Sequence, residues 1–168
     1  LNIRGLSRRL TQVNTQIAIP FILSNKGYGL LWNNYGLTDF NPADESIELV
    51  PASASGEAVT VNATSTSGNV KETRQTYSFT ASLEVPHSGR YSLLLDVGQR
   101  MARKYYLTID GDKVFDVNNL WLPPTTSAIV ELTTGKHTIE VQGERNDKPV
   151  LYWRPVSEET VFRSPVAQ

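Results

Sequence analysis

The sequence predicts an all-β protein built around an antiparallel β-sandwich. Two stretches, Tyr77–Val85 and Tyr91–Val97, alternate apolar with mostly polar residues, the period-two pattern of strands with one buried face. Pro86 and Gly89 lie between them and predict a turn. No segment shows a sustained 3.6-residue apolar period, and strand-like runs recur at short spacing between turn signals.

We expect these two stretches to pair as an antiparallel hairpin whose apolar side chains face a single core. The opposite face is polar apart from Leu94, so we expect it to be mostly wet. A sheet with one wet face needs a second layer on the other, which predicts a sandwich. The expected core side chains are Tyr77, Phe79, Ala81, Leu83, Val85, Tyr91, Leu93, Leu95 and Val97.

The bulk composition narrows the functional classes. The chain has 168 residues and no cysteine, so it can bury a sizeable core but cannot form disulfides or thiolate metal sites. Its 16 basic and 17 acidic residues give a net charge of -1, which does not favour nucleic acid or an anionic lipid surface as a partner. No apolar run approaches the ~20 residues that span a bilayer, so we expect no membrane insertion.

The first third of the chain predicts three strands. Residues 17–23 form an apolar run, which predicts a strand buried on both faces or packed against a part outside the sequence. Pro20 within it predicts an edge or bulged position. Asn25–Gly27 is a turn signal followed by a strand-like run, Tyr28–Trp32, so the two runs should form a hairpin. Ser46–Val50 predicts a short alternating strand.

The composition changes after residue 50. Pro51–Gly56 is a linker-like run of small residues, and Val59–Val70 is rich in Ser, Thr and Asn, with at most one weak strand expected. Further on, Asp110-Gly111 predicts a two-residue type I′ turn between two strands. We interpret residues 118–127 as an irregular loop. The later strands are expected at 129–132, 137–141 and 150–154.

The N-terminal run Ile19–Phe21 followed by Ser24–Asn33 resembles the N-terminal β-sandwich domain of glycoside hydrolase family 31, the α-glucosidase and α-xylosidase family. The resemblance covers about the first third of the chain. It implies that residues 1–50 and 156–168 are pieces of that domain. In residues 156–168 the chain would re-enter the domain after the inserted segment.

The inner segment, residues 51–155, resembles the jelly-roll-like β-sandwich domain first described in anthrax protective antigen. That domain is often carried by glycosidases and adhesins and is often implicated in carbohydrate binding. Some family 31 α-xylosidases have one inserted in their N-terminal domain, so the nesting supports both resemblances. The matching positions are Tyr77–Phe79, Gly89–Tyr91, Leu107–Gly111, Gly135–Val141 and Leu151–Trp153.

Family 31 enzymes are retaining, with a catalytic aspartate pair on a (β/α)₈ barrel. Such a barrel takes roughly 250 residues, more than the chain has, so no catalytic residue is carried over. The resemblance implies a non-catalytic, carbohydrate-binding accessory region of an α-glycosidase, by family analogy an α-xylosidase acting on xyloglucan-type oligosaccharides. The implied partners are an oligosaccharide or polysaccharide and the catalytic barrel of the parent. For the parent we expect a periplasmic, cell-surface or secreted location.

Trp121 is the candidate stacking residue, because an exposed indole can bury apolar area against the C–H face of a sugar ring and loops often carry function. The alternative is that Trp121 and its flanking leucines plug one end of the sandwich, or form a spacer or dimer contact without sugar. Oligomeric state is left open. The candidate carbohydrate-binding residues are Trp121, Asp110, Asp112, Asn118 and Asn119.

No metal or cofactor is assigned. In adhesins of the inner family, neighbouring aspartates hold a calcium ion that grips sugar hydroxyls, whereas here Gly111 separates Asp110 from Asp112. Calcium takes six to eight oxygen ligands, and no spacing here is an established loop, so a calcium-dependent lectin is kept only as an alternative. His87 and His137 lack metal-type partners at useful spacing and are expected to be structural. Trp32 and Trp153 are expected in the cores, and Tyr105 and Tyr106 on opposite strand faces.

Overall fold

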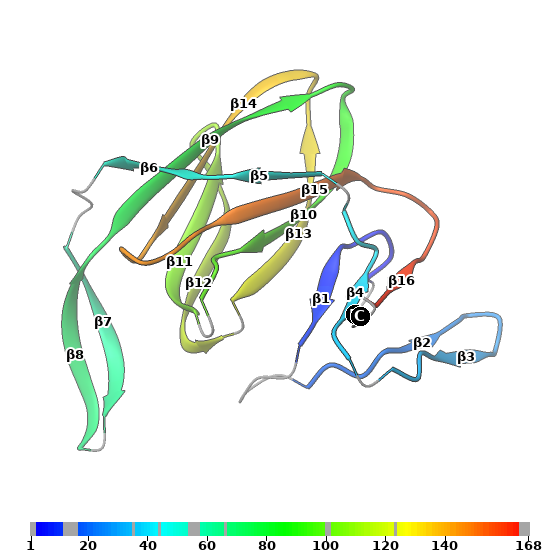
Figure 1. The fold of residues 1–168 in the computed structure, drawn as a ribbon, viewed down its shortest axis with the longest axis horizontal. Coiled ribbons are helices and arrows are strands. Elements are labelled where there is room, and N and C mark those ends of the chain that lie inside the picture. Colours follow the sequence, from blue (N-terminus) through cyan, green and yellow to red (C-terminus); the bar gives the residue numbers. More distant parts are fainter. Residues whose placement is uncertain are drawn as a thin grey trace.

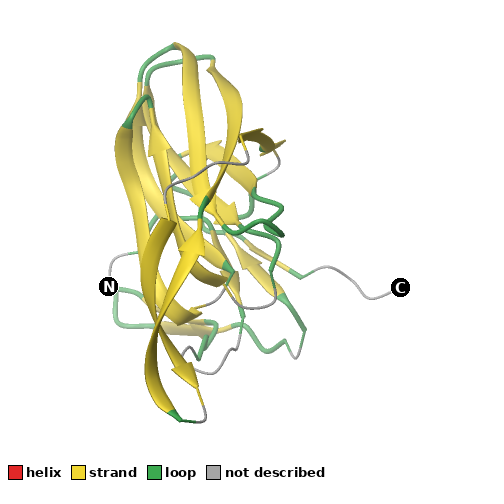
Figure 2. Cartoon of the chain, turned by 90° about the vertical axis from the view of Figure 1, so that its left-hand side faces the viewer, coloured by secondary structure: helices red, strands yellow, loops and turns green. Residues whose placement is uncertain are grey.

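The structure is a computed structural model that describes residues 3–11, 17–34, 36–43, 45–53, 58–65, 67–99, 102–122 and 124–164. Within these ranges all regular secondary structure is β-strand and there is no helix (Figure 1), which confirms the all-β prediction. Figure 2 shows the same residues as strands and loops alone. No helix able to cross a membrane occurs among them.

Two antiparallel sheets form a sandwich. The larger sheet has the strand order β12-β11-β14-β9-β6 and the smaller one β13-β10-β15-β5. All of their pairings are antiparallel. The bounds are β5 (Glu45–Glu48), β6 (Val50–Ser53), β9 (Tyr77–Val85), β10 (Gly89–Asp96), β11 (Ala102–Ile109), β12 (Asp112–Leu122), β13 (Thr125–Leu132), β14 (Gly135–Gly143) and β15 (Val150–Pro155).

The expected hairpin between the two central stretches is wrong, because β9 and β10 belong to different sheets. β9 pairs with β14 and β6, whereas β10 pairs with β13 and β15. Residues 86–88 carry the chain across the sandwich, and the Tyr91 hydroxyl donates to the His87 carbonyl there at 2.7 Å. Alternation determines which side chains face the core, and both sheets face the same core, so it cannot identify a strand's hydrogen-bonded neighbour.

The core prediction itself is confirmed. Seven of the nine expected side chains are buried in one apolar cluster, and Tyr77 and Ala81 pack against it. Trp153 belongs to the same cluster, with its ring centroid 5.6 Å from that of Tyr91. Tyr105 is buried whereas Tyr106 is only half-buried, as their opposite orientations predict. Burial raises the pKa of Tyr105 to about 12.

A further hairpin departs from the sequence expectation. Residues 59–70 were expected to hold at most one weak strand, but β7 (Ala58–Ser65) and β8 (Gly68–Gln75) pair along their full length. β-branched residues recur in both strands and favour extended backbone despite the polar composition. Gly68 takes a positive φ of 105° at the turn, which glycine adopts without steric cost. This hairpin projects from the sandwich at the lower left of Figure 1.

The two ends of the chain meet in a third sheet. It has the order β1-β4-β16, from β1 (Arg8–Leu10), β4 (Thr38–Phe40) and β16 (Phe162–Arg163). β5 lies before the predicted domain boundary at residue 50, yet it pairs with β15 of the sandwich. The proposed division into residues 1–50 with 156–168 and residues 51–155 stays a prediction.

The three-stranded sheet covers part of the outer face of β10, which was expected to be wet. β1 contacts β13, and the Ser7 amide donates to Ser92 Oγ at 2.6 Å. Ser92 and Leu94 are consequently buried. Leu94, the one apolar residue on that predicted polar face, was the sequence signal for this contact.

The predicted N-terminal hairpin is confirmed as β2 (Phe21–Leu23) and β3 (Gly29–Leu31). Its side chains are largely exposed, so the predicted burial on both faces is wrong within the described residues, whereas the alternative, packing against a part outside the sequence, stays a prediction. Trp32 is half-buried rather than in a core, and its ring stacks on Phe162 with a centroid separation of 5.5 Å and an interplanar angle of 7°. This stack ties the hairpin to β16.

Candidate functional site

The candidate residue Asp110 lies in the turn between β11 and β12. Asp110 and Gly111 both have positive φ, 51° and 90°, as the predicted two-residue turn requires. Its Oδ1 accepts a hydrogen bond from the Thr138 amide at 2.7 Å, and its Oδ2 lies 2.6 Å from His137 Nδ1. Each carboxylate oxygen therefore already has a partner within the chain.

His137 is held between two acceptors. Its Nε2 lies 2.8 Å from the Thr133 carbonyl, so Nε2 must carry a proton, and its Nδ1 faces the Asp110 carboxylate. The hydrogen bond to Thr133, followed by the one to Asp110, raises the pKa of His137. Hydrogen bonds from His137 and from the Thr138 amide lower the pKa of Asp110. The charged pair fastens the turn to β14 and gives His137 the expected structural role.

The remaining candidates are spread along β12. Asp112 is its exposed first residue, opposite Ile109, whereas Asn118 pairs with Lys104. At about 3.3 Å per residue, Asn118 is roughly 20 Å and Trp121 roughly 30 Å from Asp112. The side chains of Asn118, Asn119 and Trp121 lie outside the described residues. The structure therefore does not bring the five candidates together as one site.

The expected loop at residues 118–127 is also wrong, because β12 continues to Leu122 and β13 begins at Thr125. Pro124 lies between the two strands, as the ring chemistry of proline predicts. Trp121 consequently sits on a strand at the edge of the larger sheet. In the part of the chain that the structure describes, no group of three or more His, Asp or Glu side chains is placed to hold a metal ion.

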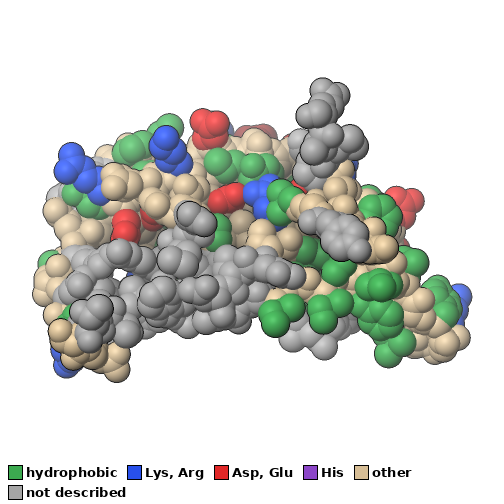
Figure 3. Space-filling view, turned by 60° about the horizontal axis from the view of Figure 1, so that its bottom comes forward, with side chains coloured by type: hydrophobic (Ala, Val, Ile, Leu, Met, Phe, Trp, Pro, Cys, Tyr) green, Lys and Arg blue, Asp and Glu red, His purple; other side chains and the backbone are tan. Residues whose placement is uncertain are grey.

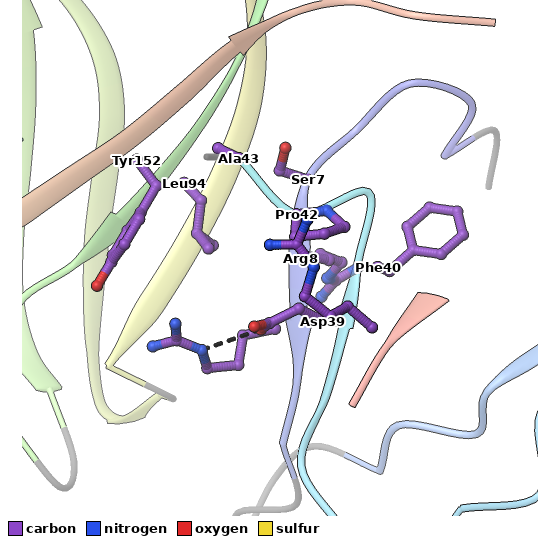
Figure 4. A pocket seen from close by; sticks show the side chains of 10 residues that line it. Ser7, Arg8, Asp39, Phe40, Pro42, Ala43, Leu94 and Tyr152 are labelled. Carbon is purple, nitrogen blue, oxygen red and sulfur yellow. Dashed lines mark hydrogen bonds and ion pairs between the residues drawn. The ribbon is translucent and has the colours of Figure 1, made fainter. Parts of the chain in front are cut away.

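A cavity lies where the three-stranded sheet meets the sandwich. Figure 4 shows Tyr152 and Leu94 on one side of it, with Arg8 and Asp39 on the other. Its volume of about 60 Å³ holds a few water molecules but is far below the ~300 Å³ or more of ordinary ligand sites. We interpret it as a junction between the two parts rather than a sugar site.

Arg9 is the central residue of this junction. Its Nε donates to Asp39 Oδ1 at 3.1 Å and its Nη1 to Asp96 Oδ2 at 2.7 Å, while its guanidinium carbon lies 5.5 Å from the centroid of the Tyr152 ring. Burial alone would lower the pKa of Arg9, but interactions with Asp39 above all, and also with Tyr152 and Asp96, raise it. Arg9 thus stays charged and joins β4 to β10. Sequence reasoning missed it, because its partners lie 30 and 87 residues away.

Replacing Arg9 should destabilise the chain. We expect Arg9→Ala to lower the free energy of unfolding by about 1–3 kcal/mol, because two charge-assisted hydrogen bonds are lost in a half-buried place. Urea denaturation measures the change. The matched control is Arg4→Ala, whose ion pair with Glu158 is exposed and is expected to contribute less than about 0.5 kcal/mol. Equal losses in the two variants would contradict the junction role.

The His137–Asp110 pair predicts a pH dependence. Since the pKa of His137 is raised on folding, its contribution is complete below the unfolded value of about 6.5 and is lost as pH rises through the folded value. The lowered pKa of Asp110 gives a contribution present above about pH 4 and lost as pH falls through the folded value. The pair should therefore stabilise most between about pH 4 and 6.5.

Urea denaturation of the wild-type chain and His137→Gln checks this. The difference in unfolding free energy should be larger at about pH 5 than at about pH 8.5. His87→Gln, which removes the exposed histidine of the crossing segment, is the control and should show no such change. A His137→Gln difference that is the same at both pH values would refute the charged pair.

No family model matches the chain. Among curated proteins, an α-xylosidase of Saccharolobus solfataricus is 62% identical over 37 residues, which are 22% of this chain and 5% of that protein. An uncharacterized family 31 glucosidase of Pseudescherichia vulneris is 53% identical over 34 residues, 20% of this chain and 6% of that protein. The matches thus span only a small part of these relatives' length.

Among solved structures, a GH31 α-xylosidase of Xanthomonas citri matches 96% of this chain and 22% of its own, with a TM-score of 0.59 and 20% identity. At that identity the likeness establishes the fold. The two curated matches, over 22% and 20% of this chain, add a local likeness to an α-xylosidase and to a family 31 glucosidase.

Proposed function

We propose that the chain is a non-catalytic, carbohydrate-binding accessory region of a family 31 α-glycosidase, and that the parent is an α-xylosidase acting on xyloglucan-type oligosaccharides. One observation carries the proposal: a segment 62% identical to an α-xylosidase occurs in a chain that shares its fold, over 96% of its length, with another. The family's catalytic barrel takes roughly 250 residues, which supports an accessory role for these 168. We further propose a periplasmic, cell-surface or secreted parent.

We assign sugar binding to the end of β12 that carries Trp121, Asn118 and Asn119. The opposite end is the weaker choice, because both oxygens of Asp110 already accept hydrogen bonds from His137 and Thr138. Trp121 lies on an edge strand, where a sugar ring can approach from beyond the sheet. An indole that stacks on the C–H face of a sugar buries apolar area, while neighbouring amides donate to and accept from hydroxyls.

Calorimetric titration of the chain with xyloglucan oligosaccharides tests this assignment. We expect Trp121→Ala to weaken binding about tenfold or more, because a stacking aromatic commonly dominates such contacts. The matched control is Tyr106→Ala. Tyr106 is half-buried on the outer face of β11, and Lys113 Nζ already lies over its ring at 4.9 Å, so its loss should leave sugar affinity unchanged.

Three outcomes would count against the proposal. Absence of wild-type binding would favour a spacer role. Wild-type binding that Trp121→Ala preserves would remove the assignment to this end of β12. Binding that a chelator abolishes would favour the calcium-dependent lectin.

A further inference from the structure

The β2–β3 hairpin carries an apolar face that nothing in the described chain covers. Along residues 17–23 every second side chain is large and apolar, and exposure alternates with the same period, so these four side chains share the exposed side although only Phe21–Leu23 belong to β2. Leu31 joins them, because it pairs with Phe21 across the hairpin. These five residues, here called the apolar face, have exposed fractions of 79% for Ile17, 69% for Ile19, 52% for Phe21, 75% for Leu23 and 60% for Leu31.

The apolar face is contiguous and uncharged. Figure 3 shows hydrophobic side chains gathered at its lower right, over this hairpin. None of the five residues is charged, and Lys26 lies apart in the turn. Single exposed apolar residues are common on protein surfaces, whereas a patch of this kind marks a contact surface. The lack of charge fits an apolar protein surface as the partner.

The Phe21 ring lies over Gly29 of the other strand, which pairs with Leu23. A Cβ atom at Gly29 would lie 2.5 Å from Phe21 Cζ and 2.9 Å from Cε2, so the ring packs directly over the glycine backbone. Any larger residue at position 29 would displace the ring. Phe21 is thus fixed in place while half of it stays exposed.

The opposite face of the hairpin is anchored to the rest of the chain at its base, while Leu30 on that face stays 51% exposed. Trp32 follows Leu31 and therefore points the other way, where it stacks on Phe162. The Trp32 amide also donates to the Pro20 carbonyl at 2.9 Å, closing the base of the hairpin. This anchoring leaves the apolar face directed outward.

An isolated two-stranded hairpin is marginally stable in water, and a sheet normally buries its apolar face against a second layer. Each of the two strands pairs only with the other within the described residues. Among the described residues, nothing therefore supplies the layer that this apolar face requires. The missing layer must be apolar protein, because lipid or nucleic acid partners would call for basic residues on or around the face.

We propose that the apolar face docks on the remaining part of the family 31 parent chain, an inference that rests on the proposed function. The solved α-xylosidase with this fold has more than three quarters of its chain outside the match. A parent of similar length would offer a large surface that is covalently linked to the hairpin. A tethered partner acts at an effective concentration of about millimolar, whereas a second copy must be recruited from solution. This favours an intrachain contact over a dimer.

Hydrogen exchange of the peptide 17–32, followed by mass spectrometry, tests the docking. In the 168-residue chain its amides should exchange rapidly, because the hairpin lacks a second layer. In the full-length parent, exchange should be slower by roughly tenfold or more. Equal rates in the two proteins would overturn the proposal.

Leu23→Ser in the parent should restore fast exchange of the same peptide, while leaving the melting temperature of the 168-residue chain unchanged, since Leu23 is exposed there. The control is Val50→Ser in the parent. Val50 has a similar exposed fraction of 61% but lies on β6, so its replacement should leave the hairpin protected. Protection that survives Leu23→Ser would refute the assigned face.

Light scattering on the parent distinguishes the intrachain contact from a contact between two copies of the chain. A doubled mass that Leu23→Ser abolishes, with protection that depends on concentration, would overturn the intrachain assignment in favour of a dimer. Activity of the parent on α-xylosides and α-glucosides is measured in parallel. If the hairpin is protected from exchange but the parent cleaves neither α-xylosides nor α-glucosides, the proposed function is wrong and the proposed docking is still supported.

Discussion

The fold depends on one continuous apolar cluster enclosed between two antiparallel sheets. Leu93 and Leu95 from one sheet and Leu107, Ile139 and Val141 from the other are among its members, and all five are fully buried. Each buried side chain of this size is worth about 1.5–3 kcal/mol relative to an exposed one, so the cluster dominates the stability of the chain. The crossing at residues 86–88 exists because the chain must supply strands to both sides of this cluster.

The way the chain enters and leaves the sandwich follows from the same packing. β5 and β15 pair antiparallel at the edge of the smaller sheet, with Glu48 opposite Val150 and Glu45 opposite Trp153. Entry and exit therefore lie side by side, a geometry in which one domain can be carried as an insertion within another. The flanking strands β4 and β16 pair directly beyond this point, and Arg9 ties them to β10.

The sequence predicts which side chains share the core much better than it predicts which strands pair. Alternation identified the core positions, and Asp110-Gly111 identified a turn, because both signals are local. Two of the strands that pair with β9 and β10, β14 and β15, lie 50 or more residues away, and no local pattern encodes such pairings. The strands β7 and β8 were missed because their polar composition concealed a high content of β-branched residues.

In the candidate site, too, local features could be predicted from the sequence and long-range partners could not. His137 was expected to be structural for want of a partner, and the structure supplies Asp110, 27 residues earlier, together with the Thr133 carbonyl. Because its carboxylate oxygens already have partners within the chain, Asp110 is a weaker candidate for binding sugar hydroxyls. Arg9 could not be found from the sequence, since nothing marks a basic residue in an N-terminal segment as the link between two distant aspartates. Leu94, an apolar residue on a polar face, was the available signal that something covers β10.

The two proposed contacts act at different places on the molecule. Docking through the β2–β3 hairpin would hold the flanking strands, and the Trp32–Phe162 stack would pass that constraint to β16. From there the Arg9 junction fixes the sandwich, and the sandwich presents the edge strand β12. An accessory sugar contact improves an enzyme only when its orientation relative to the catalytic part is fixed, because a freely moving module gains far less from being tethered. On these two proposals, the half-buried hydrogen bonds of Arg9 to Asp39 and Asp96 would help to fix the orientation of β12 relative to the parent.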